Sequence, residues 1–230
     1  MISVTLASGF ELRTLIPADL LAEGAAILVL LAAAILVYRS VRERYLLVWI
    51  FGWLLYLIYH DALFLAVRSG HPRELTALAH GCFMVAVGCF VSSILVYTNA
   101  RRYLPLVGLL CAVAIDVAVV RSLWFPGSQA LLISVQLLYR AMALIGAIRL
   151  ALFSRGRREL GIWTLTFMLL FLHMDETLHN PHFINGLDTA IEIMLGLSMI
   201  LVVLDDMRGR ARRLAVMTAI TSAIADASEP

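Results

Sequence analysis

The chain has 230 residues, of which 62% are hydrophobic and 15% are charged. Soluble domains carry about one quarter charged residues, so this composition excludes an ordinary soluble fold and predicts that most of the chain lies in lipid. The net charge is +2, and the 18 basic residues form short clusters between apolar runs, which indicates membrane orientation and no nucleic-acid partner. All of them are arginines, so a retinal Schiff base, which needs a lysine amine, is excluded.

Seven apolar segments are long enough to cross about 30 Å of hydrocarbon as helices. In chain order they are 21–38, 45–67, 75–98, 103–120, 128–152, 160–178 and 187–206. Because the connections are short, neighbouring helices are expected to run antiparallel in one bundle. The predicted fold is an all-α integral membrane protein: an extracytoplasmic N-terminal segment over 1–20, a seven-transmembrane helix bundle over 21–207, and a cytoplasmic linker over 208–230.

The arginines are concentrated on one side of the predicted bundle. Twelve share this side: Arg39, Arg42, Arg44, Arg101, Arg102, Arg155, Arg157, Arg158, Arg208, Arg210, Arg212 and Arg213. Four lie on the other: Arg13, Arg68, Arg73 and Arg121. The positive-inside rule therefore predicts an N-terminus outside and a cytoplasmic C-terminus.

Two smaller groups of residues give predictions about packing and surface. Small residues let helices approach closely, and five glycines are assigned to such contacts: Gly52, Gly81, Gly88, Gly146 and Gly196. Asp205 and Asp206 end the last span beside Arg208, where we expect them to be solvated.

Ionisable side chains at mid-helix in a membrane cost roughly 2.5–3.5 kcal/mol each for Asp, Lys or Arg, so each one is a candidate functional residue. Counting about 1.5 Å per residue along antiparallel helices places several of them at one level, in the outer third of the membrane. The cytoplasmic halves of the spans contain almost none. This distribution argues against a transporter or proton channel, which needs polar groups through the whole thickness.

Histidines and acids in this outer third predict a metal site. The segment HMDETLH in the sixth span places its histidines and acids on neighbouring helical turns. Imidazole and carboxylate together suit zinc, copper or iron. The predicted ligands are His60, His80, His173, Glu176 and His179. Residues expected around them, or in contact with a ligand, are Asp175, Glu192, Asp116, Arg140 and Asp61. Haem held by two histidines is a variant of this prediction.

Other roles for the same residues remain open at this stage. His60 and Asp175 could instead form an interhelical hydrogen bond that only stabilises the bundle. Arg140 is expected to pair with Asp116 or Glu192, because an unpaired guanidinium near mid-membrane is very costly.

The segment after the last span predicts a helix with one apolar face. Leu214, Met217, Thr221 and Ile224 follow a 3-4-3 spacing, which is typical of a coiled-coil seam and favours a parallel homodimer. The alternative is a juxtamembrane helix whose basic start binds lipid headgroups.

Two segments carry a resemblance to a known group of proteins. RRLAVMTAITSAIADA, after the last span, and RERYLLVWIFGWLLYLIYH, entering the second, resemble parts of the seven-transmembrane N-terminal sensor regions of bacterial signalling receptors. In those receptors the linker leads into GAF, diguanylate-cyclase or histidine-kinase modules. The resemblance implies a sensor in the bacterial cytoplasmic membrane, whose last helix signals to a cytoplasmic output domain. Any enzyme activity would then belong to that domain.

A membrane-embedded zinc hydrolase is the alternative function. The chain looks distantly like the seven-helix ceramidase and adiponectin-receptor group, in which three histidines hold zinc and an acid activates the bound water. That group carries His-x-x-x-His in its last span. Here the late pair, His173 and His179, is six residues apart and one span earlier, which favours the sensor.

Overall fold

The structure, a computed structural model, describes residues 24–68, 72–154, 160–175 and 184–228, with side chains except at 67–68, 160, 170–175, 184–192 and 225–228. Within these ranges the chain is helical apart from short turns and contains no strand, so the all-α prediction is confirmed there. The helices are Gly24–Val41, α2 (Arg44–Arg68), α3 (Pro72–Tyr97), α4 (Leu104–Trp124), α5 (Gln129–Phe153), α6 (Leu160–Asp175) and α7 (Ile184–Ser228), with a 3-10 turn, η1 (Arg101–Tyr103), before α4.

Five helices among the described residues are long and apolar enough to cross a membrane. They are Gly24–Val41, Arg44–Ala66, Pro72–Tyr97, Arg101–Trp124 and Gln129–Phe153. A helix satisfies its own backbone polar groups, so such segments are stable in hydrocarbon. The chain is therefore a multi-pass membrane protein.

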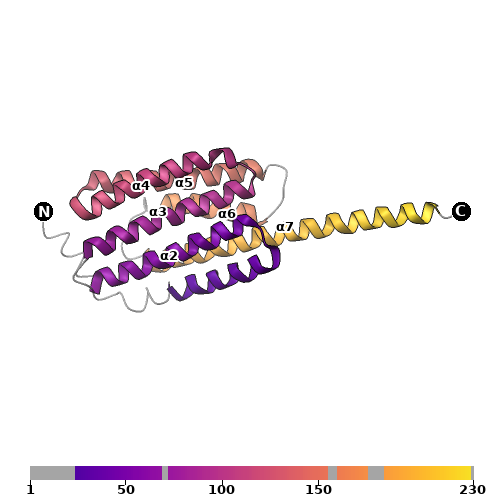
Figure 1. Ribbon diagram of the computed structural model, residues 1–230, viewed down its shortest axis with the longest axis horizontal. Helices are drawn as coiled ribbons and strands as arrows, with labels where there is room; N and C mark the ends of the chain where they lie inside the picture. The colour runs from indigo at the N-terminus through magenta and orange to yellow at the C-terminus, as the bar shows by residue number, and fades with distance from the viewer. Residues whose placement is uncertain (1–23, 69–71, 155–159, 176–183, 229–230) are drawn as a thin grey trace.

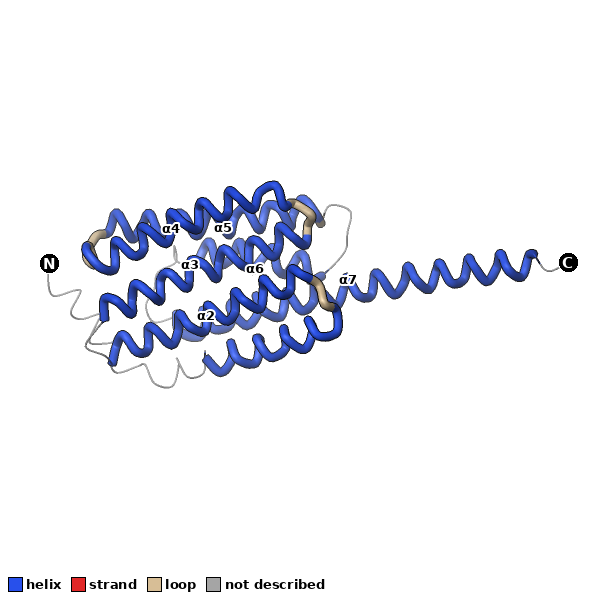
Figure 2. Tube along the Cα trace, viewed as in Figure 1, coloured by secondary structure: helices blue, strands red, loops and turns tan. Residues whose placement is uncertain are grey.

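Consecutive helices pack against one another in a bundle (Figure 1), and short turns join several of them (Figure 2). Contacts join α2 to α3, α3 to α4, α4 to α5, α5 to α6 and α6 to α7. The additional contact of α3 with α5 makes α3 an interior helix, and it has the largest buried share among the five candidate spans. The end of α7 projects alone beyond the bundle (Figure 1).

Aromatic rings form the centre of the larger of two cores. Trp49 and Trp53 on α2 are no more than 2% exposed, and their ring centroids lie 4.6 and 5.2 Å from that of Phe90 on α3. Side chains from the first helix, α6 and α7 pack into the same core: Ile27, Leu30, Ile162, Leu165, Leu169, Leu195, Met199, Val202 and Val203. The second core joins α3, α4 and α5. Because α7 packs against α6 and shares this core with α2 and α3, its position depends on theirs.

The end of α3 is closed by hydrogen bonds that satisfy its last carbonyl groups. Asn99 adopts a φ of 54°, and the Ala100 N–H donates to the Leu95 carbonyl over 2.7 Å. These are features of a helix C-terminus that reverses through one left-handed residue. Arg149 of α5 then donates to the Thr98 carbonyl over 2.9 Å and to its hydroxyl over 3.3 Å. The side chain of Arg149 thereby links α5 to the end of α3.

Asp205 does not behave as a solvated residue, which corrects the sequence prediction. Its side chain is 18% exposed, and one carboxylate oxygen accepts a hydrogen bond of 3.1 Å from the Gly161 N–H. This N–H belongs to the first turn of α6, where no carbonyl in the same helix can accept it. The carboxylate of α7 therefore caps α6, and it also lies 3.7 Å from the Arg208 guanidinium.

Glycines mark the closest helix contacts. An added Cβ would lie 2.6 Å from Phe90 at Gly52, 3.1 Å from Cys111 at Gly88, 3.4 Å from Ile94 at Gly146 and 2.6 Å from Leu30 at Gly196, as the sequence predicts. The prediction is wrong for Gly81, where a Cβ would meet nothing within 4 Å. The tightest approach is at Gly161, which the sequence analysis did not single out: a Cβ there would lie 2.4 Å from the backbone nitrogen of Val202.

Candidate functional site

His60 is the buried histidine of the candidate outer site. It lies on α2 with 8% of its surface exposed, and its ring packs against two tyrosines of the same helix. The ring centroids of Tyr56 and Tyr59 both lie 5.0 Å from that of His60, each in an edge-on arrangement. Tyr56 and His60 are four residues apart, so they share one face of the helix.

Rings from two further helices complete an aromatic cluster around His60. Phe83 of α3 lies 5.2 Å from Tyr59 and 5.8 Å from Tyr139 of α5, measured between centroids. Tyr56, Tyr59, His60, Phe83 and Tyr139 thus form one aromatic cluster. The sequence alone does not predict this cluster, because the packing of three helices brings its rings together. The four-residue spacing of Tyr56 and His60 was the one available signal.

His80 lies on α3 and makes its hydrogen bond toward α4. Its Nδ1 is 3.1 Å from the hydroxyl of Ser122, and that hydroxyl donates to the Ala118 carbonyl over 2.8 Å. While that hydroxyl donates to Ala118, its oxygen can accept a hydrogen bond from His80, which suits the tautomer with the proton on Nδ1. This tautomer leaves a lone pair on Nε2, which is the form in which imidazole binds a metal while its other nitrogen is held by a neighbour.

The helix bounds place these groups at a common height in the bundle. His60 is 16 residues after the start of α2 at Arg44, or about 24 Å along its axis at 1.5 Å per residue. His80 is 17 residues before the end of α3 at Tyr97, which gives about 26 Å from the same end of the bundle. The two helices pack side by side and run antiparallel. His60 and His80 thus occupy one level on adjacent helices.

Two predicted acids lie on exposed surfaces. Asp116 is exposed on α4, whose buried face carries Ala114 and Ala118, two residues away on either side. A two-residue step turns about 200° around a helix, so Asp116 points away from the bundle interior. Asp61 is likewise exposed, one residue and about 100° from His60. Arg140, on α5 next to Tyr139, is half-buried.

The remaining predicted site residues lie outside the described part of the chain. These are the residues Glu176 and His179, and the side chains of His173, Asp175 and Glu192. Among the described residues, no three His, Cys, Asp or Glu side chains form a group that could hold a metal ion. The metal site therefore remains a prediction. Of the predicted metal ligands, only His60 and His80 have side chains that the structure describes.

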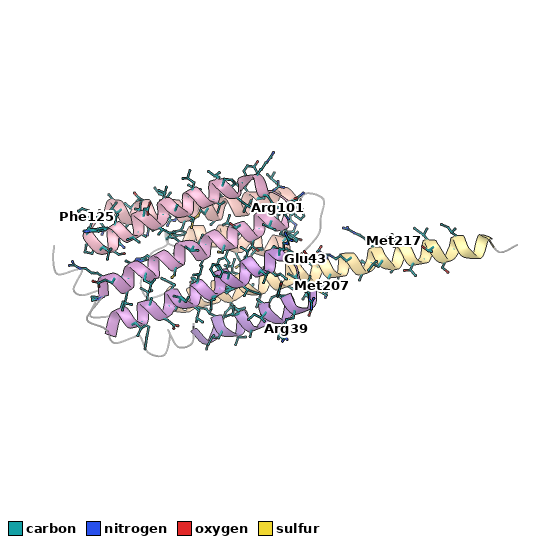
Figure 3. The ribbon with its side chains drawn as sticks, in the orientation of Figure 1. Arg39, Glu43, Arg101, Phe125, Met207 and Met217 are labelled. Atoms are coloured by element: carbon teal, nitrogen blue, oxygen red, sulfur yellow. The ribbon has the colours of Figure 1, made fainter. Side chains whose placement is uncertain are left out.

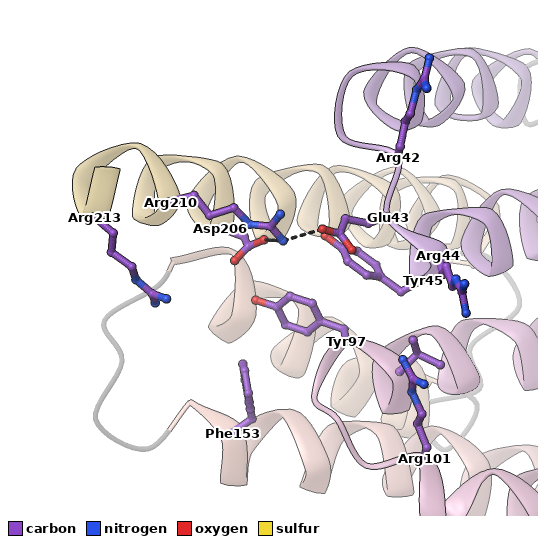
Figure 4. Close-up of a pocket in the computed structure, with 11 residues that line it drawn as sticks. Arg42, Glu43, Arg44, Tyr45, Tyr97, Arg101, Phe153, Asp206, Arg210 and Arg213 are labelled. Carbon is purple, nitrogen blue, oxygen red and sulfur yellow. Dashed lines mark ion pairs between the residues drawn. The ribbon is translucent and has the colours of Figure 1, made fainter. Parts of the chain in front are cut away.

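The opposite end of the bundle carries a network of charged residues at the base of the projecting part of α7. Figure 3 shows Arg101 and Glu43 at this end and Phe125 at the other. The Arg210 guanidinium of α7 lies 2.7 Å from a Glu43 carboxylate oxygen and 2.8 Å from one of Asp206. The hydrogen bond to Glu43 is the main reason that the pKa of Arg210 lies above its ordinary value. This ion pair connects α7 to the turn before α2 (Figure 4).

No protein-family model, curated protein or solved structure matches the chain. Its fold is that of a helical multi-pass membrane protein, and a long helix projects from one end of the bundle.

Proposed function

We propose that the chain is a sensor domain of a membrane receptor, in which a ligand or metal ion at the outer site shifts the bundle and α7 carries the shift to a cytoplasmic output domain. The continuity of α7 is the observation that carries this proposal. It is one helix from Ile184 to Ser228, with Leu195, Met199 and Val202 buried in the core and every residue over 211–224 exposed. A helix that is packed at one end and unpacked at the other transmits movement along its axis.

The proposed topology has seven spans, with the N-terminus outside and the C-terminus in the cytoplasm. Five of these spans are the long apolar helices described above, and the other two are α6 and the first part of α7. The arginines support this orientation, because Arg42, Arg44, Arg101, Arg210 and Arg213 gather at the end from which α7 projects. The resemblance to bacterial receptors adds the bacterial cytoplasmic membrane as the location.

The proposed outer site holds a zinc, copper or iron ion. His60, His80, His173, Glu176 and His179 are its ligands, with Asp175 and Glu192 nearby. Three features support it: the common level of His60 and His80, the hydrogen bond between His80 and Ser122, and the buried aromatic surroundings of His60. Aromatic walls exclude water, which strengthens the interaction of a cation with its ligands.

The projecting part of α7 is proposed to pair with that of a second chain. Leu214, Met217 and Ile224 are each 65% exposed and lie on one face of the helix. An isolated helix of this length is marginally stable in water, and burial of such a face against a parallel copy stabilises it.

Elemental analysis of the detergent-purified protein tests the site. The wild type should retain bound metal, whereas His60→Ala and His173→Ala should lose it. His182→Ala is the matched control, because this histidine follows Asn180 and Pro181, a sequence that predicts a loop, and is not one of the proposed ligands; it should keep the wild-type content. Equal metal content in all four proteins would remove the metal from the proposal.

A further inference from the structure

A cavity of about 470 Å³ lies at the base of the projecting part of α7 (Figure 4). Its volume is within the range of small-molecule sites, about 300–1,000 Å³. Segments far apart in the sequence line it: the turn before α2, the end of α3, η1, the end of α5, and α7. Its residues are Arg42, Glu43, Arg44, Tyr45, Val96, Tyr97, Arg101, Phe153, Asp206, Arg210 and Arg213. The cavity is therefore built by the tertiary fold.

The lining carries five arginines and two carboxylates. Both carboxylates, Glu43 and Asp206, pair with one arginine, Arg210. In the described part of the chain, the other four arginines have no carboxylate partner: Arg42, Arg44, Arg101 and Arg213. Four arginines that line one cavity from three segments, and that have no carboxylate partner there, favour an anion.

Tyr45 supplies a second, independent sign of a ligand. Its side chain is 5% exposed and lines the cavity, and its ring packs edge-on against Tyr97 at 5.2 Å. Its hydroxyl is buried and has no hydrogen-bond partner among the described residues. Buried hydroxyl groups in folded proteins almost always have one. An anion in the cavity would accept this hydrogen bond.

We propose that this cavity binds a phosphate group. Arginine presents a planar fork of N–H donors that matches phosphate oxygens two at a time, and several arginines can serve one phosphate from different sides. The phosphate could belong to an anionic lipid headgroup, since the cavity lies at the proposed inner surface of the membrane, or to a water-soluble phosphate ester. The recognition chemistry is the same for both.

Binding there would act on α7 directly. Arg210 and Arg213 belong to this helix, whereas Arg42, Arg44 and Tyr45 belong to the turn and to the start of α2. A phosphate between them joins the two elements and competes with Glu43 for Arg210. The phosphate site would then set the position of the projecting helix independently of the outer site, and it does not depend on the proposed metal.

The test uses the full chain in nanodiscs of phosphatidylcholine and two probes. In the first arm, calorimetry measures binding of inorganic pyrophosphate. In the second, native mass spectrometry counts phosphatidic acid retained from nanodiscs that contain both lipids. The variants are Arg213→Gln and Tyr45→Phe, which removes the hydroxyl and keeps the ring. Arg212→Gln is the matched control, because this neighbour on α7 is exposed and does not line the cavity.

Loss of one charge-assisted hydrogen bond weakens binding about tenfold or more. We expect this loss of affinity for Arg213→Gln, whereas Arg212→Gln should bind as the wild type does. Saturable pyrophosphate binding with this pattern would identify a water-soluble phosphate compound as the ligand class. Phosphatidic acid retention with the same pattern, without pyrophosphate binding, would identify a lipid headgroup. The proposal is overturned by no binding in either arm, or by binding that Arg213→Gln and Tyr45→Phe reduce no more than Arg212→Gln does.

Discussion

Substitution of Gly161 by alanine tests the contact between α6 and α7 on which the proposed signalling depends. A Cβ at this position would lie 2.4 Å from the Val202 nitrogen and 2.6 Å from the Leu201 carbonyl carbon. Both atoms are backbone, so no side chain can rotate to make room. Ordinary contact begins at 3.4 Å, so the two helices must separate locally by about 1 Å.

The cost can be worked out from what this separation disturbs. Overpacking a well-packed core costs about 1–3 kcal/mol. The hydrogen bond from the Gly161 N–H to the Asp205 carboxylate would also lengthen, and a bond to a charged group contributes roughly 1.5–3 kcal/mol. Because the two effects share one displacement, we expect a combined loss of about 2–4 kcal/mol.

Unfolding by SDS, followed by circular dichroism, measures this loss. Gly81→Ala is the matched control, because a Cβ at Gly81 meets nothing within 4 Å. Replacing this helical glycine should stabilise the protein by about 0.5–1 kcal/mol. The reasoning is refuted if Gly161→Ala loses less than about 0.5 kcal/mol, the scatter of surface substitutions, or if both variants change stability in the same direction.

Two further substitutions test the end of α3 and the projecting helix. Arg149→Gln removes two hydrogen bonds to Thr98 and should lower the free energy of unfolding by about 1–3 kcal/mol in the same assay. Arg102→Gln, an exposed control, should stay within about 0.5 kcal/mol, and equal effects would count against the proposed link. Met217→Asp places a charge on the apolar face and should convert a dimer to a monomer in sedimentation equilibrium. The control Ala215→Asp adds the same charge off that face and should remain dimeric, whereas a wild-type monomer would rule out pairing.

Local patterns in the sequence were sufficient to place the helices. The apolar runs 45–67 and 128–152 correspond to α2 and α5 within a residue at each end, and the Ser128 hydroxyl caps α5 by accepting a hydrogen bond from the Leu131 N–H. The run 103–120 stops short of the observed end of α4 at Trp124, because Arg121 ends the apolar pattern without ending the helix. Hydropathy indicates which residues favour a lipid environment, and a helix can continue beyond the last of these residues.

Contacts that depend on the register between helices could not be predicted in the same way. Asp205 was expected to be solvated because it ends an apolar run beside Arg208. It caps α6 because the packing of the two helices places the first turn of α6 next to its carboxylate. Gly81 and Gly161 illustrate the same limit. Composition identifies small residues, but which of them faces a neighbouring helix depends on the rotation of that helix.

For the candidate outer site, the sequence predicts the height of the residues along their helices, but it does not predict which side chains are in contact. Counting residues from the helix ends placed His60 and His80 at one height, and the helix bounds agree with that height. The ring contacts of Tyr59 and Phe83, and the hydrogen bond from His80 to Ser122, depend on side-chain directions that spacing alone does not give.

The proposed function requires that the outer site and the projecting helix are coupled, and a distance between the projecting helices of two chains measures this coupling. A nitroxide at Ala215→Cys, off the apolar face, in a protein whose free Cys82, Cys89 and Cys111 are replaced by alanine, reports this distance by electron-electron double resonance in nanodiscs. We predict a defined distance that shifts on addition of zinc, and no shift in the His60→Ala protein. An unchanged distance at saturating zinc, or an equal shift in the His60→Ala protein, would show that the outer site does not control the projecting helix.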